Sequence, residues 1–344
     1  MSSTSLAVLT KARAKFGKQL SEHDYNNLLA CQSVAEVMVY LKSHTHFAKV
    51  LEDVNERDVH RGRLEMLLRQ NLFYEFDALC RYDSDVSTGF SQYVIEQMEV
   101  EQILRFLILL SAKSTEKFIF QFPSFFAKHT EIDVNRLANA VNYEEFLAAL
   151  SSSPFYHLLK DFTPDKNGRL PVSDIEMKLY GYVFQNLFDL VISKTKGQEK
   201  EELKSLFFTI NDYMIFSRIL RLKKYYDLPP EKIKDNLFLK YTTLSPQLLD
   251  EMCQAESTAE VFSIMQSAGA GRMINRIGYN YAGDIPPRVK YKLAKHNIHF
   301  SVNPSVVMIS FMFTSETELM NIISLIEGIR YKVDTKTIKS LLIM

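Results

Sequence analysis

The sequence predicts an all-α protein built from three similar helical domains, on three observations. A helix N-terminal capping box occurs three times, at intervals of about a third of the chain. A second pattern, a carboxylate followed by apolar residues at helical spacing, also occurs three times, once after each box. The 344 residues include only 11 glycines and 10 prolines, which suits long uninterrupted helices. Recurrence of both patterns in the same order indicates one helical module used three times.

The first pattern pairs a Ser or Asn cap with a Glu three residues later. The cap side chain accepts from the amide three residues on, and the Glu returns to the cap amide. Apolar residues stand four and eight places after each cap, on one face of a helix, and a serine stands ten places after it. The copies are Ser33 to Glu36 with Val37, Leu41 and Ser43, Asn142 to Glu145 with Phe146, Leu150 and Ser152, and Ser257 to Glu260 with Val261, Met265 and Ser267.

The second pattern places apolar residues 1, 4, 8 and 11 positions after a carboxylate. At about 100° per residue these positions form one narrow stripe with the carboxylate on its border. We interpret the carboxylate as an edge-of-core group that fixes the rotation of its helix, with direct contact to a partner as the alternative. The carboxylates are Glu99 (before Val100, Ile103, Leu107 and Leu110), Asp212 (before Tyr213, Phe216 and Leu220, with Lys223 last) and Glu318 (before Leu319, Ile322, Ile326 and Ile329).

The residue one turn after each carboxylate differs among the copies. It is Gln102 in the first, Ile215 in the second and Asn321 in the third. A carboxylate and an amide at this spacing can share a hydrogen bond along the helix. Gln102 and Asn321 can therefore share such a bond with their carboxylates.

Helical periodicity continues between the two patterns. Leu179, Val183, Leu187 and Leu190 form one stripe, and a second runs from Leu203 to Leu220, so the segment 194–198 is predicted as the turn of a helical hairpin. The segment 83–89 is predicted as the matching turn of the first module. Asn303 is a candidate N-cap and Pro304 a first helical residue of a helix that continues past Ile329. The predicted domains are residues 1–120, 121–228 and 229–344.

Composition limits the possible partners and compartments. Lysine plus arginine equal aspartate plus glutamate at 41 each, so no overall charge favours nucleic acid or anionic lipid. The basic stretch Arg288, Lys290, Lys292 and Lys295 is interpreted as a solvated helix face, with a lipid or partner contact as the alternative. Three cysteines without paired spacing indicate a reducing compartment. No signal peptide is expected, and the uncharged stretch 300–315 is too short to span a membrane easily, which needs about 20 residues.

No segment of the sequence has the pattern of a catalytic, cofactor or metal site. The stretch from Gly269 to Arg272 lacks the Gly-Lys-Ser/Thr ending of a phosphate loop and is predicted to be a turn at a helix end. His44 and His46 point to different faces of a helix, which disfavours a metal site. The segment 165–176 has Leu170 where a calcium loop needs glycine. An all-helical enzyme that uses Glu99, Asp212 and Glu318 as acids and bases remains an alternative.

Taken together, several motifs resemble a known family. The stretches 12–15, 20–25, 28–29 and 37–42 resemble the N-terminal pattern of the C subunit of archaeal and bacterial V/A-type ATPases, whose eukaryotic counterpart is the d subunit. Glu316 through Arg330 resembles that family's E-x-E-x-x-N-[IL] helix, and Asp212 through Arg221 resembles its D-x-x-N-[IL] stretch. Ile215 departs from the pattern, because it stands where the family has Asn. The resemblance covers nearly the whole chain.

This resemblance implies an all-helical funnel of three similar domains around a pseudo-threefold axis. Such a protein sits on the cytoplasmic side of the membrane as a peripheral part of the ATPase complex. It receives the D and F subunits of the central shaft and passes torque to the membrane rotor (proteolipid) ring during H⁺ or Na⁺ transport. It has no catalysis, cofactor or metal of its own, and Glu99, Asp212, Glu318 and Asn321 take structural roles. The alternative is a helical-repeat adaptor or scaffold of another multiprotein assembly.

Overall fold

The computed structural model describes residues 3–56, 59–81, 87–165, 169–226 and 228–344. Within these ranges every regular element is a helix and there is no strand, which confirms the predicted all-α class. The chain divides into two compact units, one of residues 1–84 with 194–344 and the other of residues 85–193. The division into three domains arranged as a funnel stays a prediction.

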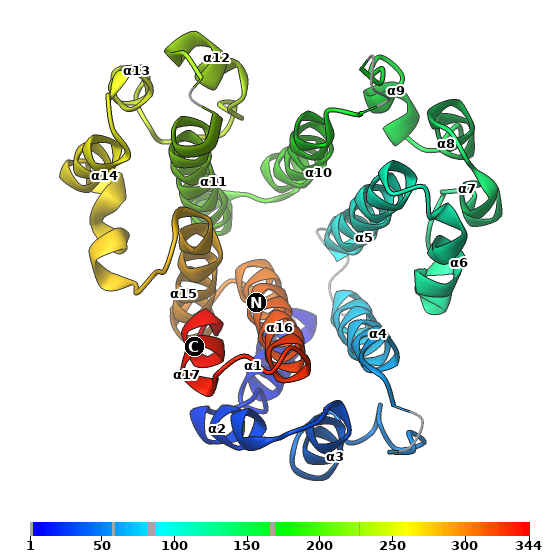
Figure 1. Ribbon diagram of the computed structural model, residues 1–344. Helices are drawn as coiled ribbons and strands as arrows, with labels where there is room; N and C mark the ends of the chain where they lie inside the picture. Colours follow the sequence, from blue (N-terminus) through cyan, green and yellow to red (C-terminus); the bar gives the residue numbers. More distant parts are fainter. Residues whose placement is uncertain (1–2, 57–58, 82–86, 166–168, 227) are drawn as a thin grey trace. The chain divides into compact units, whose positions relative to one another are not determined.

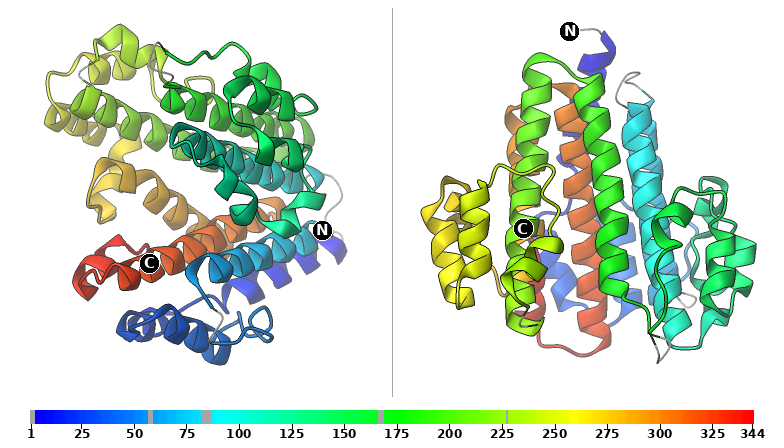
Figure 2. Two further views of the ribbon diagram at one scale, coloured as in Figure 1. Left: turned by 45° about the vertical axis from the view of Figure 1, so that its right-hand side comes forward. Right: turned by 90° about the horizontal axis from the view of Figure 1, so that it is seen from above.

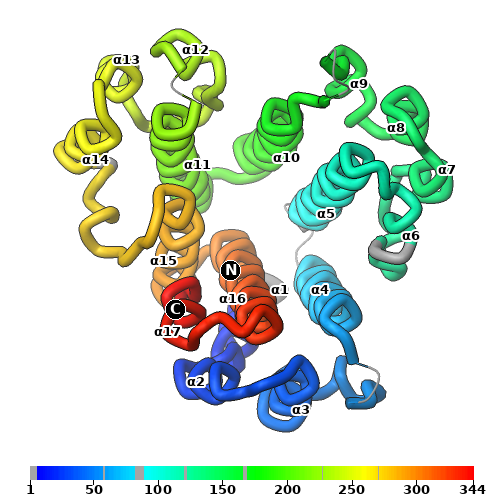
Figure 3. Tube along the Cα trace, viewed as in Figure 1, coloured from blue at the N-terminus to red at the C-terminus, as the bar shows by residue number. Residues whose placement is uncertain are grey.

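The larger unit contains both ends of the chain (Figure 1). Its long helix α16 packs against α1, α4 and α15, and α17 lies against α16 near its end. The short helices α12, α13 and α14 follow one another beside α11 in the Cα trace of Figure 3. The helices are α1 (Ser3–Phe16), α2 (Glu22–Ala30), α3 (Val34–His44), α4 (Arg61–Cys80), α11 (Gly197–Tyr226), α12 (Pro230–Asp235), α13 (Pro246–Gln254), α14 (Thr258–Ser267), α15 (Ile285–Phe300), α16 (Pro304–Arg330) and α17 (Thr335–Leu341), with 3₁₀ helices η3 (Gly269–Arg276) and η4 (Ala282–Asp284).

The smaller unit has a long helix at each end and short helices between them. Aromatic rings fill its core, where Phe106 stacks on Phe146 and meets Phe118 edge-on. Gly89 allows α5 to approach α10 closely, because a Cβ atom there would lie 1.8 Å from a methyl carbon of Leu190. The helices are α5 (Ser87–Ser111), α6 (Phe118–Gln121), α7 (Val134–Asn139), α8 (Tyr143–Ala149), α9 (Phe155–Leu159) and α10 (Val172–Lys194), with 3₁₀ helices η1 (Thr115–Lys117) and η2 (Ser124–Lys128).

The three predicted capping boxes begin helices α3, α8 and α14. Ser33, Asn142 and Ser257 each accept from the amide three residues on. The glutamate was predicted to accept from the amide of the cap residue, and this was wrong. It accepts instead from the amide of the residue before the cap. The bonds are Gln32 to Glu36 (2.8 Å), Val141 to Glu145 (2.9 Å) and Glu256 to Glu260 (2.7 Å). At α2, Ser21 and Asp24 form a reciprocal box, which the predicted pattern does not include because it requires Glu at the third position. The glutamate side chain is one methylene longer than aspartate and reaches one residue further back.

Helix α16 forms the core of the larger unit. It is the one helix of the described chain that is long and apolar enough to cross a membrane. However, 89% of its apolar 18-residue stretch is buried inside the structure. Figure 2 shows it running alongside α15 and α1. The predicted start at Pro304 and the continuation past Ile329 are confirmed, although the Asn303 side chain makes no capping hydrogen bond. Because its apolar surface is already covered, α16 is a core helix of this unit.

The two predicted turns have different outcomes. In the segment 83–89, residues 83–86 lie outside the described residues and 87–89 are wrong as a turn, because α5 begins at Ser87. The helical pattern breaks as predicted after Lys194, and α11 starts at Gly197, whose φ of +57° favours glycine. Helices α10 and α11 fall almost entirely in different units, so the hairpin between them stays a prediction.

Candidate functional site

The three carboxylates of the second sequence pattern are all buried and all hydrogen-bonded. Glu99, Asp212 and Glu318 are 3%, 2% and 5% exposed. They lie on the long helices α5, α11 and α16. A buried carboxylate is costly unless hydrogen-bond donors surround it, so the donors define what each one does.

Glu99 holds the loop that follows η2. Its Oε1 accepts from the hydroxyl of Thr130 (2.7 Å) and the amide of Glu131 (3.0 Å). The Thr130 hydroxyl also accepts from the amide of Ile132 (3.1 Å). Burial raises the pKa of Glu99, and the bonds from Thr130 and Glu131 act in the opposite direction. One carboxylate thus fixes three consecutive residues of this loop against α5.

Asp212 repeats this arrangement in the other unit. Its Oδ1 accepts from the Thr242 hydroxyl and from the amide of Thr243 (3.0 Å), and its Oδ2 accepts from the Thr243 hydroxyl. The Thr242 hydroxyl accepts from the amide of Leu244 (3.1 Å), as Thr130 does from Ile132. Burial raises the pKa of Asp212, and its hydrogen bonds lower it. Both links therefore use a threonine hydroxyl and the amide that follows it, and the Thr243 hydroxyl adds a further donor at Asp212.

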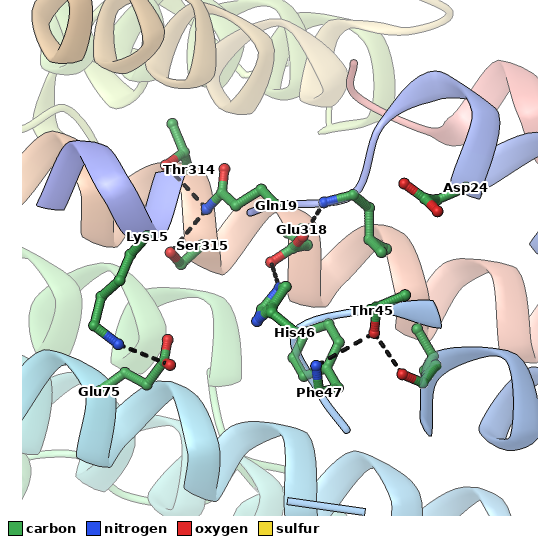
Figure 4. A network of polar contacts seen from close by, with 12 residues as sticks. Lys15, Gln19, Asp24, Thr45, His46, Phe47, Glu75, Thr314, Ser315 and Glu318 are labelled. Carbon is green, nitrogen blue, oxygen red and sulfur yellow. Dashed lines mark hydrogen bonds and ion pairs between the residues drawn. The ribbon is translucent and has the colours of Figure 1, made fainter. Parts of the chain in front are cut away.

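Glu318 makes the third link with different donors (Figure 4). Its Oε1 accepts from the amide of Leu20 (2.6 Å), and its Oε2 lies 3.1 Å from Nε2 of His46. Beside it, Gln19 Nε2 donates to Ser315 Oγ (2.9 Å), and Lys15 pairs with Glu75 (2.9 Å). Glu318 thus ties α16 to the loop between α1 and α2.

The three links follow one order along the chain. Each carboxylate holds a segment that leads into one capped short helix and then into a predicted capping box. Glu99 stands in this relation to Asn142, Asp212 to Ser257, and Glu318 to Ser33. The first two links cross the predicted boundaries at 120/121 and 228/229. The third joins residues 298 positions apart, from the end of the chain to its beginning. Carboxylate, loop and capping box therefore form a repeated unit whose third copy is completed by the N-terminal segment.

The amides one turn after the carboxylates have separate environments. Asn321 holds the C-terminal segment, because its Nδ2 donates to the Ile343 carbonyl (2.7 Å) and its Oδ1 accepts from the Ile343 amide (2.9 Å). Its Nδ2 also contacts the Tyr25 hydroxyl (3.2 Å). The Oε1 of Gln102 is buried without a partner among the described residues. Asn321 thus links α16 to the chain end as well as to α2.

Other buried acids were missed by the sequence analysis. Both oxygens of Glu96 accept from Asn186 Nδ2 at 3.2 Å, and burial raises the pKa of Glu96. Asp284 accepts from Arg288 (2.7 Å), and Glu65 pairs with two arginines of its own helix. Glu96 stands three residues before Glu99 on the same helix, which is a usable sequence signal, but its partner lies on α10. Arg288 and Lys290, predicted to be solvated, pair with Asp284 and Glu316, whereas Lys292 and Lys295 are exposed.

Residues weighed as metal or phosphate ligands have structural contacts. His46 lies against Glu318, while the ring of His44 packs on Tyr40. A Cβ atom on Gly271 would lie 1.8 Å from the Met265 carbonyl, so this glycine permits close packing of η3 on α14. In the part of the chain that the structure describes, no group of three or more His, Cys, Asp or Glu residues could hold a metal ion.

These contacts define a class of protein. It is an all-helical protein in which buried carboxylates fasten long helices to the loops before short capped helices. The chain belongs to the ATP synthase (C/AC39) subunit family, which matches residues 8–341. The C subunit of the A-type ATP synthase of Methanosphaera stadtmanae is 25% identical over 268 residues, spanning 77% of this chain and 66% of the relative. The predicted resemblance to the C subunits of V/A-type ATPases is thereby confirmed.

Proposed function

We propose that this chain is a non-catalytic central-stalk subunit of a V/A-type rotary ATPase. In this role it couples the shaft, formed by the D and F subunits, to the membrane rotor ring during H⁺ or Na⁺ transport. Family membership supports a place in an ATP synthase complex. The observation that carries the mechanical role is the series of three buried links at Glu99, Asp212 and Glu318.

A subunit that transmits torque must not yield between its helices. Close-packed interiors resist deformation, and buried hydrogen bonds are costly to break because no water replaces the lost partner. Each of the three links joins a long helix to a loop, where a helical protein is otherwise easiest to deform. The Glu318 link extends this bracing to the beginning of the chain. The proposal places the protein on the cytoplasmic face of the membrane, bound through the complex.

Co-purification tests this role directly. An affinity-tagged copy of the full chain is recovered from detergent-solubilised membranes of its source organism, and its partners are identified by mass spectrometry. The expected partners are the shaft proteins and the proteolipid ring in stoichiometric amounts. Recovery with an unrelated set of proteins would instead indicate the adaptor or scaffold role. A soluble activity of the isolated chain that disappears in Glu99→Gln, Asp212→Asn and Glu318→Gln would indicate an enzyme.

A further inference from the structure

A groove of about 610 Å³ opens on the larger unit, and none of the residues that form the three links lines it. The last turns of α11, the start of α14 and the segment 279–283 enclose it. All of these segments belong to one compact unit. Its volume lies in the range of about 300–1,000 Å³ found for binding pockets.

Aromatic rings form much of the groove wall. Tyr225, Tyr281 and Tyr279 are 67%, 57% and 39% exposed. The ring of Phe262 stacks on that of Tyr279, with the ring centroids 5.6 Å apart. A Cβ atom on Gly283 would lie 3.0 Å from the Tyr281 ring, so glycine leaves room for that ring. Exposed rings packed in this way can bury large area on binding at little entropic cost.

The same groove carries positive charge. Arg221 and Lys224 stand one turn apart on α11, and both are exposed. Lys223 has a structural contact, because its ammonium group donates to the carbonyls of Cys253 and Ala255. Arg221, by contrast, makes no ion pair with any described residue. Among the described residues that line the groove there is no Asp or Glu. An incoming carboxylate therefore meets attraction without a competing acid in the wall.

We propose that this groove binds an acidic peptide segment of a partner protein, one that carries an apolar or aromatic side chain between its carboxylates. Spaced carboxylates match Arg221 and Lys224, and the apolar side chain matches the tyrosine faces. A dense polyphosphate fits less well, because it has no apolar group to cover the exposed rings of Tyr225, Tyr279 and Tyr281. Tyrosine and arginine together are typical of the residues that dominate protein interfaces. The inference rests on the proposed function, in which the chain works in contact with other proteins of the complex.

The absence of tryptophan from the chain gives a direct assay. The probe is the peptide acetyl-Gly-Glu-Glu-Trp-Glu-Leu-Gly-amide, whose single tryptophan is excited selectively while purified full-length protein is titrated in at low salt. Saturable binding is expected, with the tryptophan emission shifted to the blue as the ring leaves water. The same peptide with lysine in place of glutamate is expected not to bind.

Variants locate the binding. The double variant Arg221→Gln with Lys224→Gln is expected to weaken binding about tenfold or more, and Tyr281→Ala about fivefold. Matched controls are Lys336→Gln, an exposed cation, and Tyr331→Ala, an exposed ring, and both are expected to bind as the unmodified chain does. Circular dichroism of each variant checks that the helices are intact.

Three results would overturn this inference: equal binding of the lysine peptide, unchanged binding by the groove variants, or displacement of the acidic peptide by equimolar ATP. The last would indicate a site for small polyanions. Because the assay uses the isolated chain, its failure leaves the co-purification result untouched. If co-purification fails but the peptide still binds, the rotary role is rejected and the groove remains a binding site for acidic peptides.

Discussion

At the scale of single residues, Asp212 and Glu99 show how a buried carboxylate can organise a loop. An ionised carboxylate only accepts hydrogen bonds, and each of these two is met by a threonine hydroxyl and the next backbone amide. The threonine hydroxyl in turn accepts from the amide two residues on. The threonine thus acts as donor and acceptor at once, which makes it as important to the link as the acid.

Replacing a linking threonine by valine should therefore destabilise the fold. Thr242→Val keeps the volume but removes a donor to Asp212 and an acceptor for Leu244, so a loss of about 1–3 kcal/mol in unfolding free energy is expected. Thr130→Val should give a similar loss through Glu99. Thr10→Val, on the exposed face of α1, serves as the control and should change stability by about 0.5 kcal/mol or less. Urea unfolding of the three variants measures the difference, and equal stability of all three would contradict the role of these links.

The buried Glu96 predicts a dependence of stability on pH. Burial raises its pKa above the ordinary 4.5, so the folded state binds the proton more tightly than the unfolded chain. Stability should fall as the pH rises from 4.5 through the raised pKa, because the unfolded chain loses its proton first. Glu96→Gln should flatten part of this slope in urea unfolding measured at increasing pH above 4.5. Glu116→Gln, an exposed acid of the same unit, should keep the full slope, and the same slope in both variants would reject the assignment.

At the scale of helices and loops, local patterns predicted where helices begin. Ser33, Asn142 and Ser257 cap their helices as expected, because a cap bond spans only three residues. The partners of the carboxylates could not be predicted in this way. Thr130 and Thr242 lie 31 and 30 residues from their acids, and Leu20 lies 298 from Glu318. Such contacts depend on which helix packs against which loop, and a helical period contains no information about that.

Helix α17 docks on α16 through a glycine, and this contact can be tested. A Cβ atom on Gly328 would lie 2.5 Å from a side-chain carbon of Ile338. Gly328→Ala should push α17 away and cost about 1–3 kcal/mol, and adding Ile338→Ala should recover part of the loss because it makes room. Gly269→Ala is the matched control, since nothing lies within 4 Å of a Cβ there. Thermal unfolding measures the loss of stability, and hydrogen exchange of residues 331–344 measures the displacement of α17. If the losses of stability from Gly328→Ala and Ile338→Ala simply add in the double variant, this packing is contradicted.

At the scale of the whole molecule, the Glu318 link joins the third copy of the repeat to a segment that precedes the first copy in the sequence. Leu20 and His46 supply to Glu318 what the segments 130–131 and 242–243 supply to Glu99 and Asp212. The chemistry of this third link differs, because His46 and a backbone amide replace the threonine. The same role filled by different donors indicates that the position of the carboxylate, rather than its partner, is the constant feature of the repeat.

If the protein transmits torque, weakening two links should impair coupling before it prevents assembly. Asp212→Asn with Glu318→Gln keeps the side-chain volumes but replaces an acceptor oxygen at each link by an amide donor, so the loops gain freedom under load. In purified complexes reconstituted into vesicles, ATP hydrolysis should continue, while ion transport per ATP hydrolysed should fall about twofold or more relative to the unmodified complex. Asp235→Asn, an exposed acid on α12, should leave the ratio unchanged. A complex that assembles and keeps the full transport ratio in the double variant would mean that these buried links stabilise the fold alone.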